Sequence, residues 1–269
     1  MAKIIDIIKR NKQFSFSFEV TPDISEEEID NLRVDPSFFS ITWHAKTHQN
    51  KDLDIAPLKI AKFLRSKEKE VLLHLSCDFM KRNFLFRVLL LLQEINIRNL
   101  FIILGEGFDP ETSDFKDSSE LIKCIRDHSG PYFCIGVAGL PDCNDDKLIA
   151  LKRKINLGAD FVLTQAFFEA NIYKTFVHRC KKIDINVPII PGIFYFETYT
   201  QLSGFINMCQ IKVSDNILEY VKNDQSNKIT GGDIIKQLIR DINDEKIYHV
   251  HFFTMNKLRV ISDFVNKLY

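Results

Sequence analysis

Eight short apolar runs, rich in β-branched and aromatic residues, recur along the chain. They cover residues 14–20, 38–43, 70–76, 99–104, 133–138, 160–165, 188–193 and 249–254. Between them, apolar residues recur three or four positions apart, as in amphipathic helices, at 55–64, 83–93, 121–125, 148–155 and 172–180. Strands that alternate with helices imply parallel β-α-β units.

Eight such units predict an α/β fold, a (β/α)8 TIM barrel, with a doubly wound open sheet as the competitor. No G-x-G-x-x-G follows the first run, and polar residues stand where nearly every run ends, which favours a barrel with one mouth. These residues are Glu19, Thr42, His74, Glu106, Gln165 and Thr254.

The segment 194–248 is too long for a single crossover. It contains helical patterns at 201–209, 215–221 and 232–243, so we expect extra helices in the last βα unit. Only residues 222–228 read as an exposed polar loop, and no linker or repeat interrupts the chain. We therefore predict a single barrel domain over residues 1–269.

The charge balance excludes several classes of partner. The 36 basic and 36 acidic residues leave no basic surface for nucleic acid or anionic lipid, so a small molecule is the expected ligand. Six cysteines without a CxxC pair favour a reducing compartment. Residues 1–12 predict an amphipathic helix and no signal peptide, and the longest apolar stretch, 84–92, is too short to span a membrane. A cytoplasmic protein is expected.

Glu19 ends a run in which phenylalanine and serine alternate over residues 14–18. Carboxylates are rarely buried without a partner or a function. At the end of a barrel strand, flanked by aromatic residues, Glu19 could have a raised pKa and act as a general acid. A structural ion pair or a solvated strand end is the equally weighted alternative.

Three residues raise the question of a metal. His44 and His48 have the i, i+4 spacing of a helix and Asp52 follows, but a zinc enzyme needs a third fixed ligand. We favour loop histidines, or a ligand contact by His44 alone, and expect no metal. His249 and His251 alternate on one strand face, and we expect at least one of them to be structural.

Two polar residues interrupt or follow buried strands. His74 lies near the end of its strand, where it could be either a hydrogen-bonded core histidine or a residue that contacts a ligand. Gln165 follows a strand and precedes two phenylalanines, so its amide could meet the edge of a heteroaromatic ring or cap a helix. The Gly-Glu-Gly at 105–107 lacks the spacing of a P-loop or a dinucleotide fingerprint.

Several strings together resemble the catalytic domain of methylenetetrahydrofolate reductases. They are FSFEVTP (16–22), ITWHA (41–45), HLSC (74–77), GVAGLP (136–141), LKRKINLGADFVLTQAFFE (151–169), VPIIPGIF (187–194) and HFFTMNK (251–257). The resemblance runs in order along almost the whole chain. It implies a (β/α)8 barrel with FAD at its mouth, which passes a hydride from NADH or NADPH to 5,10-methylenetetrahydrofolate and yields 5-methyltetrahydrofolate.

The resemblance also implies roles for individual residues. Glu19 would be the general acid, and Glu106 the acid beside the flavin. The flavin contacts would be Thr42, Trp43, Ala45, His74, Gly105, Glu106, Ser118, Ala138, Arg153 and Lys154. The folate contacts would be Gln165, Gln201, Phe205, Phe253 and Lys257. The family assembles differently in different branches, so a homo-oligomer is compatible with the resemblance.

The chain departs from the family pattern mainly on the flavin side. Leu104 begins the tripeptide that is Arg-Gly-Asp in the family, and Asp117 and Leu140 replace tyrosines. Phe253 lacks a tyrosine hydroxyl, and Lys257 replaces an arginine, whose bidentate fork lysine cannot reproduce.

Two alternatives follow from these departures. One is a divergent folate-binding or regulatory homologue with weak or no reductase activity. The other is a barrel reductase that uses the nicotinamide directly, without FAD, or uses a different flavin. The chain ends soon after the last predicted strand, so we expect no C-terminal regulatory domain of the kind that eukaryotic relatives carry.

Overall fold

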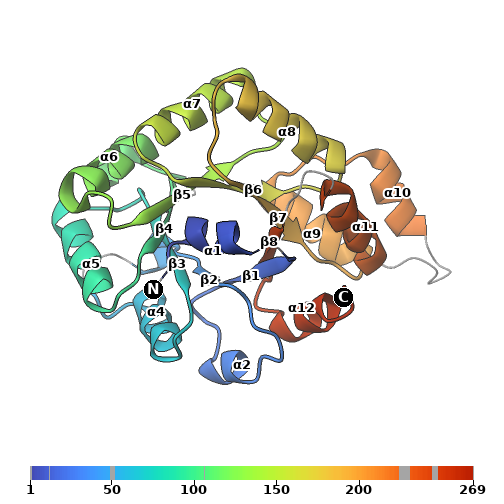
Figure 1. The fold of residues 1–269 in the computed structure, drawn as a ribbon, viewed down its shortest axis with the longest axis horizontal. Helices are drawn as coiled ribbons and strands as arrows, with labels where there is room; N and C mark the ends of the chain where they lie inside the picture. The colour runs from blue at the N-terminus through green and yellow to red at the C-terminus, as the bar shows by residue number, and fades with distance from the viewer. Residues whose placement is uncertain are drawn as a thin grey trace.

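Eight parallel strands close into a barrel in the computed structural model, which describes residues 2–11, 13–48, 52–105, 107–223, 231–243 and 248–268 (Figure 1). Every strand pairs in parallel with its sequence neighbours, and β8 pairs with β1. The strands are β1 (Ser15–Val20), β2 (Phe39–Ile41), β3 (Val71–Ser76), β4 (Asn99–Ile103), β5 (Cys134–Gly139), β6 (Phe161–Ala166), β7 (Ile189–Phe194) and β8 (His249–Phe253). The predicted barrel and its eight strands are confirmed.

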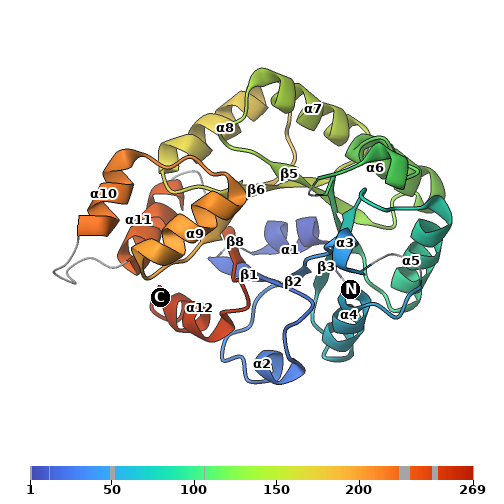
Figure 2. The ribbon, with the colours of Figure 1, turned by 180° about the vertical axis from the view of Figure 1, so that it is seen from behind.

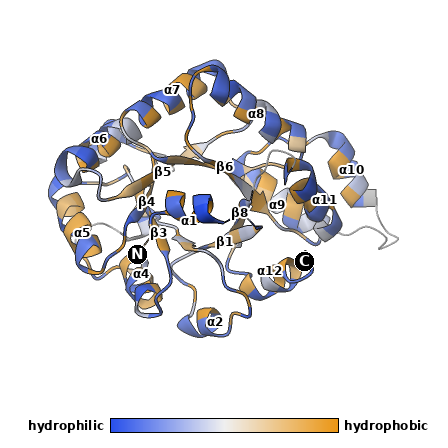
Figure 3. Cartoon of the chain, in the orientation of Figure 1, coloured by the Kyte–Doolittle hydropathy of each residue, from blue (hydrophilic) through white to orange (hydrophobic). Residues whose placement is uncertain are grey.

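Helices surround this barrel and bury their apolar faces against the strands (Figure 2). They are α1 (Ile4–Arg10), α2 (Glu26–Asp30), α3 (Ala45–His48), α4 (Ala56–Ser66), α5 (Arg82–Glu94), α6 (Ser118–Ser129), α7 (Asp145–Asn156), α8 (Ala170–Lys182), α9 (Tyr199–Cys209), α10 (Asp215–Asn223), α11 (Gly231–Asn243) and α12 (Leu258–Val265). Figure 3 shows hydrophilic residues recurring along these helices, whereas β5 and β6 are mostly hydrophobic.

The extra helices predicted in 194–248 are α9, α10 and α11, which lie between β7 and β8. The polar loop predicted at 222–228 falls largely outside the described residues. Three helices, α2, α3 and α12, were not predicted. The four or five residues of α2 and α3 are too few for a periodic pattern. α2 is instead specified by a capping box between Ser25 and Glu28.

Helix α1 closes one end of the barrel. Its residue Ile4 is fully buried among inward-facing strand residues such as Leu72, Phe101 and Phe161. The backbone nitrogen of Ile4 donates to Asn99 Oδ1 at 2.9 Å, at the first residue of β4. Figures 1 and 2 show α1 at this end and α3 and α9 at the opposite end. A ligand must therefore enter at the carboxyl ends of the strands.

The inner layer is closely packed between α1 and the mouth. A Cβ atom on Gly136 would lie 2.3 Å from the Phe161 ring, so only glycine leaves room for this ring inside the barrel.

All six cysteines are free. Within the described part of the chain, no helix has the length and apolar character needed to cross a membrane.

Candidate active site

Glu19 lies at the carboxyl end of β1 and faces the barrel interior. A β-strand points successive side chains to opposite sides, so Glu19 shares the inner face with Ser15 and Ser17. Glu19 pairs with Ser40 on one neighbouring strand and with Phe253 on the other. Its backbone oxygen accepts a hydrogen bond from the hydroxyl of Thr254, which joins the ends of β1 and β8.

Burial raises the pKa of Glu19 from 4.5 to about 8. Desolvation is the only cause, because no charged or hydrogen-bonding side chain within the described ranges acts on this carboxyl. The side chain nevertheless keeps part of its surface exposed, so a molecule in the mouth can reach it. Glu19 is thus protonated at neutral pH and able to act as a general acid.

A column of serine and histidine side chains fills the barrel below Glu19. The hydroxyl of Ser15 lies 2.8 Å from His249 Nδ1, and His249 Nε2 lies 3.0 Å from the hydroxyl of Ser17. The same Ser17 hydroxyl lies 2.7 Å from His251 Nδ1. These groups come from β1 and β8, which pair side by side.

Both histidines of the column are neutral. Burial lowers the pKa of His249 to about 3 and that of His251 well below its ordinary value. The ring of Phe38 stacks against both imidazoles, with centroids 5.3 and 5.8 Å away. His251 Nε2 is buried and has no hydrogen-bond partner among the described residues. The prediction that at least one of the two is structural fits His249, which is bonded at both nitrogens.

His74 occupies the inner face of β3, two strands from β1. Its Nε2 lies 2.6 Å from the hydroxyl of Ser40, and its ring is tilted against Phe101 at 4.8 Å. Burial lowers the pKa of His74 to about 3, so this histidine is also neutral. His74 is thus a hydrogen-bonded core histidine, and its contact with a ligand stays a prediction.

Three aromatic rings gather where β7, β8 and α9 meet. Phe205 on α9 stacks on Phe194 at the end of β7, with centroids 3.6 Å apart and planes 4° from parallel. Phe253 on β8 lies 6.4 Å from Phe205. Two of the three were predicted as folate contacts, whereas Phe194 was not, because nothing in its own strand pattern marks a stacking partner. Together they can hold a planar ring.

The two predicted glutamines lie on β6 and on α9. Gln165 is half-buried on β6, where the register against β7 shifts, and its Oε1 accepts from the Ala166 nitrogen at 3.0 Å. Gln201 lies in the first turn of α9, and its Oε1 accepts from the Glu197 nitrogen at 2.7 Å. Each amide therefore keeps its NH2 group for another partner.

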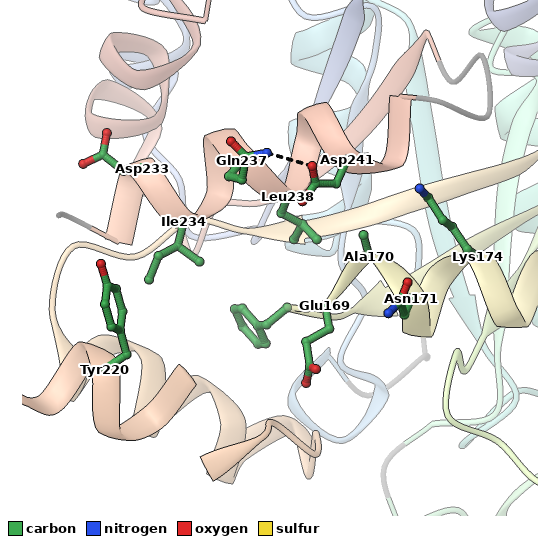
Figure 4. Close-up of a pocket in the computed structure, with 11 residues that line it drawn as sticks. Glu169, Ala170, Asn171, Lys174, Tyr220, Asp233, Ile234, Gln237, Leu238 and Asp241 are labelled. Carbon is green, nitrogen blue, oxygen red and sulfur yellow. Dashed lines mark hydrogen bonds between the residues drawn. The ribbon is translucent and has the colours of Figure 1, made fainter. Parts of the chain in front are cut away.

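Lys257, the last predicted folate contact, is exposed just before α12. It lines a cavity of about 550 Å³ between α2 and α12, together with Arg33 and Arg259. A second cavity, of about 750 Å³, lies between the start of α8, α10 and α11 (Figure 4). Glu169, Asp233 and Asp241 give that second lining an acidic character, which does not suit the anionic glutamate of a folate.

The positions predicted for the flavin lie mainly after β2, β3, β4 and β5. Thr42 faces inward, and its hydroxyl is buried without a partner among the described residues. The Trp43 ring packs outward against Phe84 on α5, so only its backbone could meet a cofactor. Ala45 is buried at the start of α3, and Ala138 is exposed at the end of β5.

The remaining flavin positions surround the start of α6. Ser118 is buried as the first residue of α6, and Arg153 Nη1 lies 3.7 Å from the capping carboxylate of Asp117. Burial lowers the pKa of Lys154, while Cys77, after β3, and Asp117 act in the opposite direction. The positive φ of Gly105, +105°, lets the chain pass close to β3.

Two side chains considered from the sequence cannot be placed. Glu106 lies outside the described residues, as does the side chain of His48. His44 is exposed, and the described residues contain no group of three or more histidine, cysteine, aspartate or glutamate side chains arranged to hold a metal ion.

Sequence reasoning missed Asp78, which directly follows Cys77 at the end of β3. Asp78 is 2% exposed, and its Oδ1 is buried without a partner among the described residues. Its Cβ lies where a side chain on Gly105 would be. The sequence did carry one signal for Asp78, because it is a polar residue just after a strand.

Comparisons with known proteins bear on this site. The family model described as methylenetetrahydrofolate reductase matches residues 3–269. "Methylenetetrahydrofolate reductase (NADH) 1" of Arabidopsis thaliana is 29% identical over 94% of this chain and 48% of its own length. "5,10-methylenetetrahydrofolate reductase" of Pectobacterium carotovorum subsp. carotovorum is 29% identical over 92% of this chain and 86% of its own. The chain spans about half the length of the first plant and yeast relatives.

A solved structure from Clostridium thermocellum shares the fold. It superposes with a TM-score of 0.66 over 97% of this chain and 95% of its own, at 16% identity. It is described as an uncharacterized protein that binds two copies of 5-methyl-5,6,7,8-tetrahydrofolic acid. At this identity the likeness shows the fold alone.

Proposed function

The chain belongs to the methylenetetrahydrofolate reductase family, and from that premise we propose that it reduces 5,10-methylenetetrahydrofolate to 5-methyltetrahydrofolate. The hydride would come from NADH or NADPH through bound FAD. The observation that carries the proposal is Glu19, a protonated carboxyl on the inner face of the barrel mouth that no described side chain pairs with.

Glu19 would deliver a proton to the substrate. Ring opening of the methylene bridge requires protonation of a folate nitrogen, which produces an iminium electrophile. A carboxyl with a pKa of about 8 holds its proton at neutral pH, and its poor solvation makes ionisation costly until the substrate nitrogen is present to take the proton.

The folate ring would lie against the aromatic cluster of Phe194, Phe205 and Phe253. Stacking on Phe205 and a hydrogen bond from the free NH2 group of Gln165 would fix the plane and the edge of the pterin. Gln201 would contribute a second amide at the start of α9. Lys257 offers a positive charge for the glutamate carboxylates at the outer edge of the mouth.

The residues at the predicted flavin positions have the chemistry needed to bind FAD. The buried hydroxyl of Thr42 lacks a hydrogen-bond partner among the described residues, as expected of a group that contacts a ligand. Arg153, Lys154 and the start of α6 at Ser118 together offer positive charge and backbone donors to a diphosphate. Bound FAD would supply a carrier that accepts a hydride from one substrate and gives it to the other.

Two measurements test the proposal. Purified protein, with FAD added if needed, should show a flavin absorption spectrum; failure to take up FAD would refute the flavin mechanism. Glu19→Gln should still be reduced by NADH or NADPH yet fail to reduce methylenetetrahydrofolate. Glu94→Gln, at an exposed glutamate on α5, is the matched control and should behave as wild type. Normal turnover in Glu19→Gln would remove Glu19 from its role.

A second candidate function is folate binding without reduction. It is favoured by Leu104 and Leu140, which are 43% and 37% exposed beside the flavin positions, where the family has an arginine and a tyrosine. Calorimetry with 5-methyltetrahydrofolate separates the candidates. Tight folate binding by a protein that takes up no FAD would select this second function.

A further inference from the structure

The turn between β8 and α12 has an unusual backbone. Met255 and Asn256 both lie in the left-handed region, with φ of +48° and +57°, and they are the only consecutive non-glycine residues there within the described part of the chain. Most of the other left-handed residues end a helix, where this conformation is common; they are Glu68, Asn96, Asp184 and Gln210. A left-handed pair before a helix has no such explanation. It is unfavourable for residues with a side chain and persists only where the surroundings impose it.

The side-chain amide of Asn256 imposes this backbone by binding the loop after β1. Its Oδ1 accepts a hydrogen bond from the Thr21 nitrogen at 2.9 Å. Its Nδ2 donates to the Thr21 hydroxyl oxygen at 2.5 Å and to Asp23 Oδ1 at 3.3 Å. The Thr21 hydroxyl donates to the same carboxylate oxygen. The oxygen and the nitrogen of the amide are therefore both used, in a residue type that tolerates left-handed backbone.

Asp23 is a strong acceptor for this amide because it is ionised at neutral pH. The hydrogen bond from the Thr21 hydroxyl lowers the pKa of Asp23, and its own backbone, the Asn256 amide and the His44 imidazole act in the same direction. Thr21 and Asp23 thereby join the loop that leaves β1 to Asn256 in the turn that leaves β8. We refer to Thr21, Asp23 and Asn256 as the Asn256 clamp.

The Asn256 clamp fixes the backbone of the next residue, Lys257. The Asn256 nitrogen donates to the Thr254 hydroxyl at 3.1 Å, and the Lys257 nitrogen donates to the Thr254 backbone oxygen at 2.8 Å. These two bonds close the left-handed turn and place Lys257 at the N-cap of α12. Asn256 and Lys257 both line the cavity of about 550 Å³ between α2 and α12. The Lys257 side chain is exposed, so the turn decides which space it can reach.

We propose that Asn256 is a positioning residue for folate binding: through Thr21 and Asp23 it holds the left-handed turn that presents Lys257 to the carboxylates of the substrate. Holding the turn before the substrate arrives reduces the ordering that binding requires, so the clamp acts on substrate affinity. Hydride transfer itself should not depend on it. This inference rests on the proposed function, because it needs Lys257 to meet the glutamate of a folate.

The Asn256→Gly variant tests this role. Glycine adopts left-handed backbone readily but offers no amide, so the turn loses its hold on the loop after β1. We expect the KM for methylenetetrahydrofolate and the Kd for 5-methyltetrahydrofolate to rise roughly two- to fivefold, as for loss of the Lys257 contact itself, with little change in kcat. Unchanged KM and Kd values would overturn the proposal.

Asn96→Gly is the matched control. Asn96 is also a left-handed asparagine, with φ of +59°, but it lies in the turn between α5 and β4, at the opposite end of the barrel. Its Oδ1 accepts from Arg98 Nε at 3.3 Å. The KM and Kd of this variant should remain those of the wild type. An equal rise in Asn96→Gly would assign the effect to general loosening of the backbone and overturn the proposal.

Combining Asn256→Gly with Lys257→Ala shows whether Asn256 acts through Lys257. If it does, the double variant should have the same KM as Lys257→Ala alone, because the lysine that the clamp positions is already gone. Two factors that multiply, to roughly four- to 25-fold, would show that Asn256 acts independently of Lys257 and would refute the positioning role.

Urea unfolding tests the clamp without any ligand. Thr21→Val removes the hydroxyl that Asn256 binds, so it should destabilise the Asn256→Gly protein less than the Asn96→Gly protein. Equal effects in the two backgrounds would refute the clamp. A wild type that binds no folate would refute the proposed function, and with it the substrate role of Lys257, whereas the unfolding result would stand without it.

Discussion

The raised pKa of Glu19 predicts that this residue makes stability fall as the pH rises. In the unfolded chain the carboxyl ionises near pH 4.5, whereas in the folded protein it holds its proton up to about pH 8. Between these values the folded state binds one more proton than the unfolded state. The free energy of unfolding therefore decreases with pH across this window, and the loss stops above it.

The size of the effect follows from the width of the window. From pH 5.5 to 7.0 the slope of about 1.36 kcal/mol per pH unit accumulates to about 2 kcal/mol. Water reaching the exposed part of Glu19 stabilises the ionised form and reduces this figure, so we expect about 1 to 2 kcal/mol.

Urea unfolding of the wild type and of Glu19→Gln at the two pH values measures this change in the free energy of unfolding. The buried histidines also make stability depend on pH, but they are common to both proteins and cancel in the difference. The stability of Glu19→Gln relative to wild type should rise by about 1 to 2 kcal/mol between pH 5.5 and 7.0. A difference that does not change with pH would refute the raised pKa and, with it, the general acid.

Three further predictions concern packing and substrate binding. Gly136→Ala should destabilise by about 1–3 kcal/mol in urea unfolding because its methyl group meets an aromatic ring, whereas Gly204→Ala, in open space on α9, should be neutral or slightly stabilising. Ile4→Ala should lower the free energy of unfolding by about 2–5 kcal/mol, because α1 closes the barrel, whereas Ile149→Ala, at a residue that is 64% exposed, should lower it by about 0.5 kcal/mol or less. Equal effects of the two substitutions would contradict the role of α1 in closing the barrel. Lys257→Ala should raise the KM for folate roughly two- to fivefold with little change in kcat, and Lys257→Arg should not; an unchanged KM in the alanine variant would exclude the contact.

Much of the fold could be predicted because its signals are local. The strand runs and most helices lie where the period-two and period-3.6 patterns place them, and the family resemblance is confirmed by the family model. Short helices such as α2 and α3 were missed because their few residues carry no periodicity. Strand order needed closure of the sheet, which pairs β8 with β1 across more than 230 residues of chain.

The same distinction between local signals and long-range contacts applies to individual site residues. Alternation of serine and phenylalanine in residues 14–18 is enough to put Glu19 on the same face of its strand as Ser15 and Ser17, because a strand turns successive side chains to opposite sides. Only the closed barrel shows that this face is the inner one. No local pattern could show that Ser17 bonds two histidines of β8, or that Phe205 stacks on Phe194.

The sequence by itself therefore determined the barrel, the strand face that Glu19 shares with Ser15 and Ser17, and the family to which the chain belongs. The tertiary structure decided the environment of Glu19: the absence of a charged partner among the described residues, the neutral histidines beneath it and the aromatic cluster beside it. The physical reason is that a side chain's orientation depends on its own strand, whereas its desolvation and its hydrogen-bond partners depend on every strand that closes around it.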